Sequence, residues 1–143
     1  MNSEISNGAE TKFSKKIIML AIVIIVNVVI IILLTPIGFE TRPQSDLKPL
    51  GYIAIATIFV GLALNLASIG LLFKKARVRL ASSLAIVISV LFLLVILVDR
   101  TGSFFSLPIP PAINTLEYLF TIVLIVTLFA ASMVYRESKH TSS

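Results

Sequence analysis

The chain has 143 residues, of which 57% are hydrophobic and only 13% charged, and its mean hydropathy is +1.05. A soluble domain carries about a quarter charged residues, so this composition excludes an ordinary soluble globular protein. Cysteine is absent, which excludes disulfides, thiolate metal sites and a cysteine nucleophile. The net charge of +5 would suit nucleic acid, but the basic residues are spread around apolar segments, and we expect no nucleic-acid partner.

Four long apolar blocks follow one another along the chain, at about residues 17–36, 50–73, 80–98 and 116–135. A helix rises about 1.5 Å per residue, so about 20 apolar residues cross a hydrocarbon core of about 30 Å. Helices also satisfy their own backbone amides in lipid, and the blocks lack the alternation that transmembrane strands show. The sequence therefore predicts an all-α membrane protein with four transmembrane helices in an antiparallel bundle over residues 17–135.

Polar segments flank this predicted domain. Residues 1–16 form a polar and basic tail, whose first eleven residues (MNSEISNGAET) we expect to be mobile, and residues 136–143 form a short second tail. Basic residues precede the first block as in a signal peptide, but the block exceeds a signal core and no small-x-small cleavage site follows it. We therefore expect the first block to remain as a span. His140, the only histidine, lies in the second tail, where we expect it to be solvated.

Lysine and arginine divide unevenly between the two sides of this topology. The side of the chain ends carries nine of them, Lys12, Lys15, Lys16, Lys74, Lys75, Arg77, Arg79, Arg136 and Lys139. The other side carries three, Arg42, Lys48 and Arg100. Because positive residues stay cytoplasmic during insertion, both termini should lie in the cytoplasm, with the protein in the cell membrane. The tyrosines Tyr52, Tyr118 and Tyr135 fall near span ends, as interfacial aromatics do.

The densest basic cluster is the loop between the second and third blocks, with Lys74, Lys75, Arg77 and Arg79. Such a cluster could bind lipid head groups or nucleic acid. Four charges in a short cytoplasmic loop are also the ordinary topology determinant of a membrane protein, strengthened by attraction to anionic lipid. We favour the topology interpretation.

The blocks contain no residue that is charged at neutral pH except Glu117, next to the start of the fourth. Among their neutral polar residues, Asn27, Ser89 and Thr127 fall near the membrane midplane and Asn65 about one turn away. These four residues either hold helices together by hydrogen bonds or line a small polar path, and we favour the interhelical contacts. A line of small residues, Ala81, Ala85 and Ser89, allows close helix packing within one chain or between chains.

The segment between the third and fourth blocks, DRTGSFFSLPIPPAIN, is oily and stiff for a loop. Gly102 is expected to take a left-handed conformation where the third helix stops. The apolar and proline residues that follow are Phe104, Phe105, Leu107, Pro108, Ile109, Pro110 and Pro111. They form either a flap that rests on the bundle at the lipid interface or a stiff ridge for docking a partner protein. Both interpretations remain open from the sequence.

The fourth helix has a candidate N-terminal cap in Asn114-Thr115-Leu116-Glu117. In such a capping box the Asn114 side chain would accept a bond from the third helical amide, and Glu117 would bond back to the cap residue. The box predicts that the helix begins directly after Asn114 and that Glu117 has a structural role.

No known catalytic or nucleotide-binding motif occurs, and we expect no enzyme activity, catalytic residue, cofactor or metal site. The carboxylates Glu40, Asp46, Asp99 and Glu117, interspersed with basic residues, are expected to form solvated ion pairs rather than a catalytic site. The preferred hypothesis is a non-catalytic accessory, scaffold or stabilising subunit, partnered by the lipid bilayer and by other membrane subunits or copies of itself. The alternative is a small oligomeric transporter or channel lined by neutral polar residues, and catalysis by the outer carboxylates comes last.

Overall fold

The computed structural model describes residues 2–42, 45 and 47–141. Over these residues the chain forms four long helices and one 3-10 helix: α1 (Asn2–Thr41), α2 (Pro49–Leu72), η2 (Lys75–Arg77), α3 (Val78–Arg100) and α4 (Pro111–Thr141). Each long helix contains a segment long and apolar enough to cross a membrane, namely Phe13–Gly38, Pro49–Leu72, Val78–Arg100 and Pro111–Ser138. The predicted all-helical class and the four candidate spans are thus confirmed.

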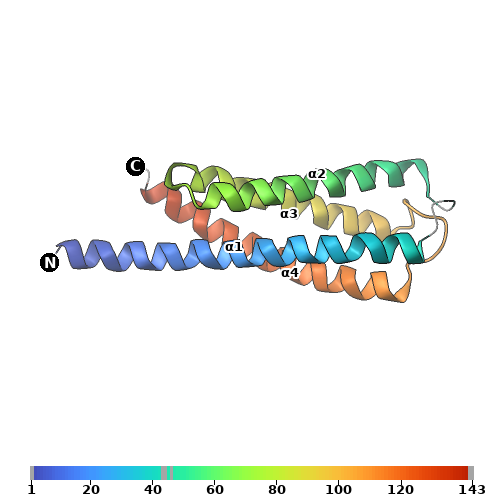
Figure 1. The fold of residues 1–143 in the computed structure, drawn as a ribbon, viewed down its shortest axis with the longest axis horizontal. Helices are drawn as coiled ribbons and strands as arrows, with labels where there is room; N and C mark the ends of the chain where they lie inside the picture. Colours follow the sequence, from blue (N-terminus) through green and yellow to red (C-terminus); the bar gives the residue numbers. More distant parts are fainter. Residues whose placement is uncertain (1, 43–44, 46, 142–143) are drawn as a thin grey trace.

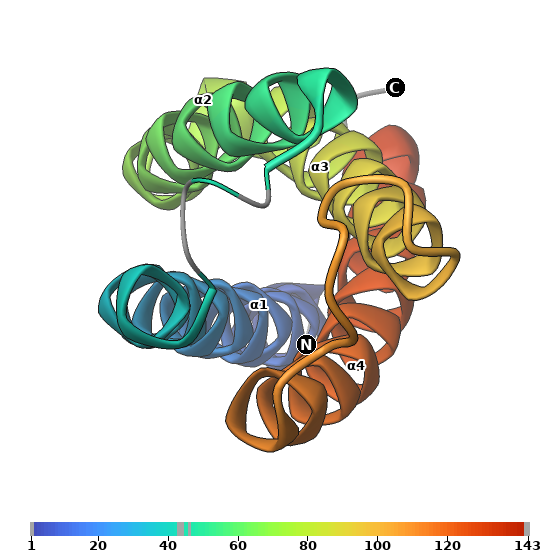
Figure 2. The same ribbon diagram turned by 90° about the vertical axis from the view of Figure 1, so that its right-hand side faces the viewer.

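The four helices lie side by side along the long axis of the molecule (Figure 1). Viewed from one end they form a ring in chain order, in which α2 packs mainly on α3, while α4 packs on both α3 and α1 (Figure 2). The two chain ends and η2 lie at one end of the bundle, which we call the terminal end (Figure 1). The end of α1, the start of α2 and the loop of residues 101–110 lie at the other end, which we call the loop end (Figure 1).

The interior consists of two apolar clusters with a polar layer between them. The cluster nearer the terminal end contains Leu20, Ala21, Ile24, Leu72, Val78, Ala81, Ala85, Ala131 and Val134. The cluster nearer the loop end contains Ile30, Ile31, Ile88, Phe92, Ile96, Phe120 and Leu124. Asn27 and Thr127 fall between the two clusters along α1 and α4. The small residues Ala81, Ala85 and Ser89 are all buried inside this one chain, so their close packing serves its own bundle.

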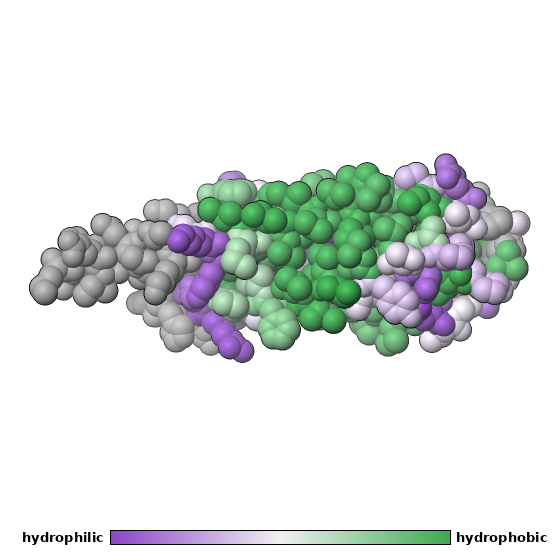
Figure 3. Space-filling view, turned by 90° about the horizontal axis from the view of Figure 1, so that it is seen from below, coloured by the Kyte–Doolittle hydropathy of each residue, from purple (hydrophilic) through white to green (hydrophobic). Residues whose placement is uncertain are grey.

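The face of the bundle seen in Figure 3 is apolar along its middle and more polar toward its ends. Large side chains such as Ile53, Val87, Leu97, Ile122 and Phe129 are more than half exposed. An apolar surface of this extent is unusual for a protein in water and suits one whose outer face contacts lipid. The exposure of large apolar side chains along the middle of the bundle therefore agrees with the four candidate spans.

Helices α1 and α4 run beyond the predicted blocks. α1 begins at Asn2, so residues 2–11 are helical rather than the mobile tail that we expected. Once a helix is nucleated, each further residue adds one hydrogen bond, so a polar leader can extend it. α1 also continues past Pro36 to Thr41, beyond its predicted end. α4 runs to Thr141 and takes in most of the predicted tail 136–143.

The start of α4 corrects the predicted capping box. The helix begins at Pro111, three residues before Asn114, and the backbone amide of Asn114 donates to the carbonyl of Pro110 at 2.9 Å. Proline suits the first helical position because its φ is already helical and it has no amide to leave unbonded. Asn114 therefore lies within the first turns of α4, and Glu117 is free for another role. Gly102 has a φ of 77°, which confirms the predicted left-handed turn after α3.

Candidate functional site

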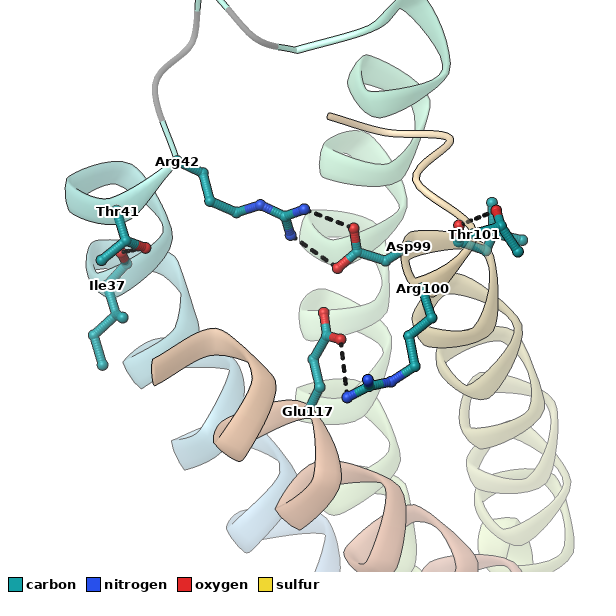
Figure 4. A network of polar contacts seen from close by, with 8 residues as sticks. Ile37, Thr41, Arg42, Asp99, Arg100, Thr101 and Glu117 are labelled. Atoms are coloured by element: carbon teal, nitrogen blue, oxygen red, sulfur yellow. Dashed lines mark hydrogen bonds and ion pairs between the residues drawn. The ribbon is translucent and has the colours of Figure 1, made fainter. Parts of the chain in front are cut away.

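The most distinctive chemistry of the molecule lies at the loop end, where four charged side chains from α1, α3 and α4 converge (Figure 4). Arg42 follows the last turn of α1, and its amide still donates to the carbonyl of Gly38 at 2.8 Å. Asp99 and Arg100 form the last turn of α3, and Glu117 lies in the second turn of α4. Because α1 continues past Pro36, it carries Arg42 to the level of these residues.

Arg42 and Asp99 form a bidentate ion pair across the bundle. Arg42 Nη1 donates to Asp99 Oδ2 at 2.8 Å and Nη2 donates to Oδ1 at 2.9 Å. Only 9% of the Arg42 side chain and 5% of the Asp99 side chain are exposed. Two parallel, charge-assisted bonds in this geometry are among the strongest and most specific polar contacts in proteins. The sequence prediction of solvated ion pairs is therefore wrong for Asp99, which is buried.

The loop of residues 101–110 covers this ion pair. The Phe105 ring lies under the Arg42 guanidinium, 3.9 Å from its carbon atom to the ring centroid. Phe105 also forms an isolated β-bridge with Leu47, and the amide of Lys48 donates to the carbonyl of Phe104 at 2.7 Å. Lys48 Nζ donates to the carbonyl of Gly102 at 2.8 Å. These contacts fasten the loop to the start of α2 and keep the guanidinium away from solvent.

The proline-rich loop thus divides into a covered part and an exposed part. Phe104 is only 7% exposed and Phe105 is half-buried, so both phenylalanines pack on their own chain. Ile109 and Pro110 are also half-buried, while Leu107, Pro108 and Pro111 are exposed. The flap interpretation describes the phenylalanines, and only the exposed residues around Leu107 could meet another molecule.

Glu117 adds a second carboxyl to the cluster. It is 7% exposed, and its carboxyl interacts directly with that of Asp99. Arg100 Nη2 lies 3.7 Å from Glu117 Oε1, which is an ion-pair distance but too long for a hydrogen bond. Glu117 Oε1 therefore has no hydrogen-bond donor although it is buried. The prediction that Glu117 caps its own helix is wrong, because the carboxyl points toward α3 (Figure 4).

Directly beside these charges is a cavity of about 530 Å³. Arg42, Asp99 and Glu117 line one end of it, with Phe104 and Phe105 from the loop. Its remaining walls are largely apolar and come from all four helices, including Ile31, Leu34, Ile55, Phe59, Val95 and Phe120. Phe92 packs on Phe120 with ring centroids 5.5 Å apart and lines the cavity deep in the bundle. A pocket of this size with a few convergent polar groups is typical of ligand sites.

The four polar residues predicted to contact one another between helices behave differently. Asn27 Nδ2 donates to Thr127 Oγ1 at 2.8 Å and so joins α1 to α4. Thr127 in turn donates to the carbonyl of Val123 at 2.7 Å. Asn65 and Ser89 are buried as well, but the Nδ2 atom of Asn65 has no hydrogen-bond partner. The structure therefore brings together the pair from α1 and α4 and leaves the α2 asparagine amide unsatisfied.

The basic loop lies at the terminal end. Lys74 and Arg77 are exposed, the Lys75 side chain lies outside the described part, and Arg79 packs against Tyr135 of α4, 5.3 Å above its ring. Lys16 of α1 pairs with Glu137 of α4 at the same end. His140 also lies outside the described side chains. Over the residues described, no group of three or more histidine, cysteine or acidic side chains could hold a metal ion.

Comparison with known proteins adds no relative, because no protein-family model, curated protein or solved structure matches this chain. The class of protein is therefore defined by its own fold and site. It is a helical bundle with four helices able to span a membrane, and it has a buried charge cluster above an apolar cavity.

Nothing in one sequence pairs Arg42 with Asp99. The residues are 57 positions apart, and each lies beside other charges of both signs. The available signal was weaker, namely that the few charged residues of this side gather at span ends next to an oily loop. That signal shows where the charges gather, but from it we expected solvated ion pairs, and it gave no indication of their burial.

Proposed function

We propose that this chain is a small non-catalytic integral membrane protein that holds an amphiphilic molecule at the loop end of its bundle. With the amphiphile bound, the protein serves as an accessory or stabilising subunit of a membrane assembly. The observation that carries the proposal is the cavity of about 530 Å³, with charged groups at one end and apolar walls along its length. An amphiphile has the same division, a polar head and an apolar chain.

The proposal includes an orientation. The helices form an antiparallel bundle across the cell membrane with both termini in the cytoplasm, so the cavity opens within the outer half of the bilayer. The nine-to-three division of basic residues supports this orientation. A reporter fused after Ser143 and another inserted between Lys75 and Ala76 should both read cytoplasmic. An extracellular or periplasmic signal from either position would overturn the orientation.

The charge cluster supports binding more than catalysis. Asp99 uses both carboxylate oxygens to accept from Arg42, and that guanidinium is covered by Phe105. A general acid or base must reach a substrate proton, and these groups already hold one another in a closed arrangement. Such a buried network fixes the geometry of a binding pocket at the level of the helix ends.

A small oligomeric transporter or channel is the second candidate. It is favoured by three buried polar atoms that have no partner within the described residues: Asn27 Oδ1, Asn65 Nδ2 and Ser68 Oγ. Buried polar atoms of this kind often contact water, and water in a span would suit a polar path. Ion flux through liposomes containing the purified protein, abolished by Asn65→Leu, would favour this candidate over the amphiphile.

The main proposal is tested by a substitution at Gly38 that places a larger side chain in the cavity. A Cβ added to Gly38 meets nothing within 4 Å, and Gly38 lines the cavity, so Gly38→Leu should occupy that space without a clash. Gly70→Leu is the matched control, because a Cβ there also meets nothing within 4 Å and Gly70 is exposed on α2, away from the cavity. Both changes replace one helical glycine by leucine and should favour the helix to a similar degree.

The readout is the lipid and other amphiphile extracted from protein purified in mild detergent and measured by mass spectrometry. Wild type and Gly70→Leu should each retain one amphiphile per chain, and Gly38→Leu should lose most of it. Equal retention by the two variants, or no retained amphiphile in wild type, would overturn the proposal. Copurified protein subunits, identified in the same preparation, test the accessory role separately.

A further inference from the structure

The wall of the cavity is buried on two helices and exposed on a third. From α3 and α4 it is lined by Phe92, Ile96 and Phe120, which are 1%, 8% and 3% exposed. From α2 it is lined by Tyr52 and Phe59, which are 55% and 52% exposed. Tyr52 and Phe59 lie two helical turns apart, so they share one face of α2. The cavity is therefore closed toward α3 and α4, and along α2 its wall continues into the outer surface.

Helix α1 forms the other edge of this opening. Leu34, Thr35 and Gly38 of α1 line the cavity and are only partly buried. A Cβ added to Gly38 meets nothing within 4 Å, so there is open space in front of this face of α1. Among the neighbouring pairs of long helices in the ring, α1 and α2 pack on each other least (Figure 2). Over the described residues the cavity thus opens sideways, between α1 and α2.

The opening lies at the depth of the hydrocarbon core. Leu34 and Thr35 belong to the candidate span Phe13–Gly38, and Tyr52 and Phe59 belong to Pro49–Leu72. The rise of a helix places Phe59 about 15 Å from the start of α2, near the middle of a core of about 30 Å. Across the membrane, the molecules outside this opening are lipid acyl chains rather than water.

The loop of residues 101–110 covers the end of the cavity that faces the aqueous side. Phe104 and Phe105 of the loop line the cavity. A Cβ added to Gly51 would come within 2.7 Å of the Phe104 carbonyl oxygen, so the loop backbone rests directly on the first turn of α2. Beside it, Arg42 and Asp99 hold α1 to α3. A ligand that came from the water would have to displace these contacts, whereas a ligand from the bilayer would not.

We infer that an acyl chain of a bilayer phospholipid enters the cavity sideways between α1 and α2, while its head group stays in the membrane interface at the loop end. This inference rests on the proposed function and names its amphiphile. The Thr35 hydroxyl already donates to the carbonyl of Ile31 at 2.9 Å, so the α1 edge of the opening suits hydrocarbon. Ile31 and Arg42 mark the length of the cavity along α1. The rise of a helix places them about 16 Å apart, about half of the hydrocarbon core, which is the depth of one leaflet.

The test uses a tryptophan reporter, because the chain contains no tryptophan. Phe120→Trp places the reporter on the cavity wall, and Phe129→Trp places it on the outer surface of α4, where Phe129 is 71% exposed. The full-length proteins are reconstituted in phosphatidylcholine vesicles whose acyl chains carry bromine, which quenches tryptophan fluorescence at short range. Relative to vesicles without bromine, both reporters should lose most of their emission, although Phe120 is buried within its own chain.

A pair of threonine variants tests the route of entry. Thr35→Phe narrows the opening, so the Phe120→Trp reporter should recover most of its emission while the Phe129→Trp reporter stays quenched. Thr57→Phe is the matched control, because Thr57 is a partly buried residue of α2 that donates to the carbonyl of Ile53 at 2.8 Å and does not line the cavity. In that control both reporters should stay quenched. Circular dichroism and thermal unfolding of each variant show that it is folded.

The outcomes separate the inference from the function beneath it. A Phe120→Trp reporter that bromine does not quench, or that is quenched equally in the folded Thr35→Phe and Thr57→Phe variants, would overturn the inference. Gly38→Leu and Gly70→Leu give the same comparison if Thr35→Phe does not fold. If the protein in mild detergent retains a free fatty acid or another amphiphile while the reporter stays unquenched, the proposed function holds and the inference is wrong. If it retains no amphiphile and the reporter stays unquenched, both are wrong.

Discussion

The two ends of the bundle hold ion pairs of the same kind in different surroundings. At the loop end Arg42 and Asp99 join α1 to α3, with side chains 9% and 5% exposed. At the terminal end Lys16 and Glu137 join α1 to α4, with side chains 32% and 34% exposed. Both pairs connect helices far apart in the chain, but only the first is removed from solvent. An ion pair's energetic role therefore depends on where the fold places it.

The physical reason is desolvation. A partly exposed pair keeps much of its hydration when it breaks, so its net contribution is about 0–1 kcal/mol. A buried pair has lost that hydration, and removing one partner leaves an uncompensated charge at a cost of about 3–5 kcal/mol. The loop of residues 101–110 provides the cover at the loop end, with Phe105 on the Arg42 guanidinium.

The largest effect is expected from Arg42→Met. The variant leaves the carboxyls of Asp99 and Glu117 close to each other, and only the Arg100 guanidinium then remains to balance their charge. The free energy of unfolding in detergent should fall by about 3–5 kcal/mol. Stepwise unfolding with a denaturing detergent, followed by circular dichroism, measures the loss.

A double variant separates the missing partner from the missing pair. Arg42→Met combined with Asp99→Leu replaces both charges by apolar groups, and it should recover most of the stability lost in the single variant. A double variant that is as unstable as Arg42→Met alone would mean that the pair itself, rather than the charge left behind, carries the stability.

An intermediate effect is expected in the polar layer between the two ends. Asn27→Leu removes the bond to Thr127 and should lower the free energy of unfolding by about 1 kcal/mol. Asn65→Leu is the matched comparison, because the buried Nδ2 of Asn65 has no partner to lose. That variant should be as stable as wild type or slightly more stable. Equal losses in the same detergent unfolding assay would show that Asn65 has a partner that this structure does not contain.

The smallest effect is expected from Lys16→Met, which breaks the ion pair at the terminal end. With about one third of each side chain exposed, the loss should stay below about 1 kcal/mol and shrink further in high salt. It is the direct counterpart of Arg42→Met, since both replace the cation of an ion pair by methionine. If Lys16→Met and Arg42→Met lower the free energy of unfolding equally in the same assay, the burial of an ion pair does not determine its contribution to stability.

The sequence by itself determined the helical class and the number of candidate spans. Both depend on the length and hydropathy of continuous segments, which are local properties of the chain. The turn at Gly102 was equally local, because glycine adopts a positive φ at little steric cost. The depth of Asn27 and Thr127 could also be counted along their spans, and the two residues meet in the folded bundle.

The start of α4 shows where local patterns fail. Asn114 and Glu117 match a capping box, but Pro111 and Pro110 precede them and allow the helix to begin earlier. The capping box and the proline at Pro111 are both valid signals for the start of a helix, and the sequence pattern alone did not indicate which of them the helix uses. The fold then used Glu117 in the charge cluster, which no capping rule could indicate.

Only the tertiary structure decided the site. Pairing Arg42 with Asp99 requires α1 to extend past Pro36 and two helices to face each other at matched depth, and neither follows from a residue's neighbours in sequence. Burial of Phe104 and the cavity beside it depend in the same way on how four helices and a loop surround one space. Hydropathy is a property of each segment alone, whereas a charge cluster and a cavity are properties of the relative rotation and depth of several segments.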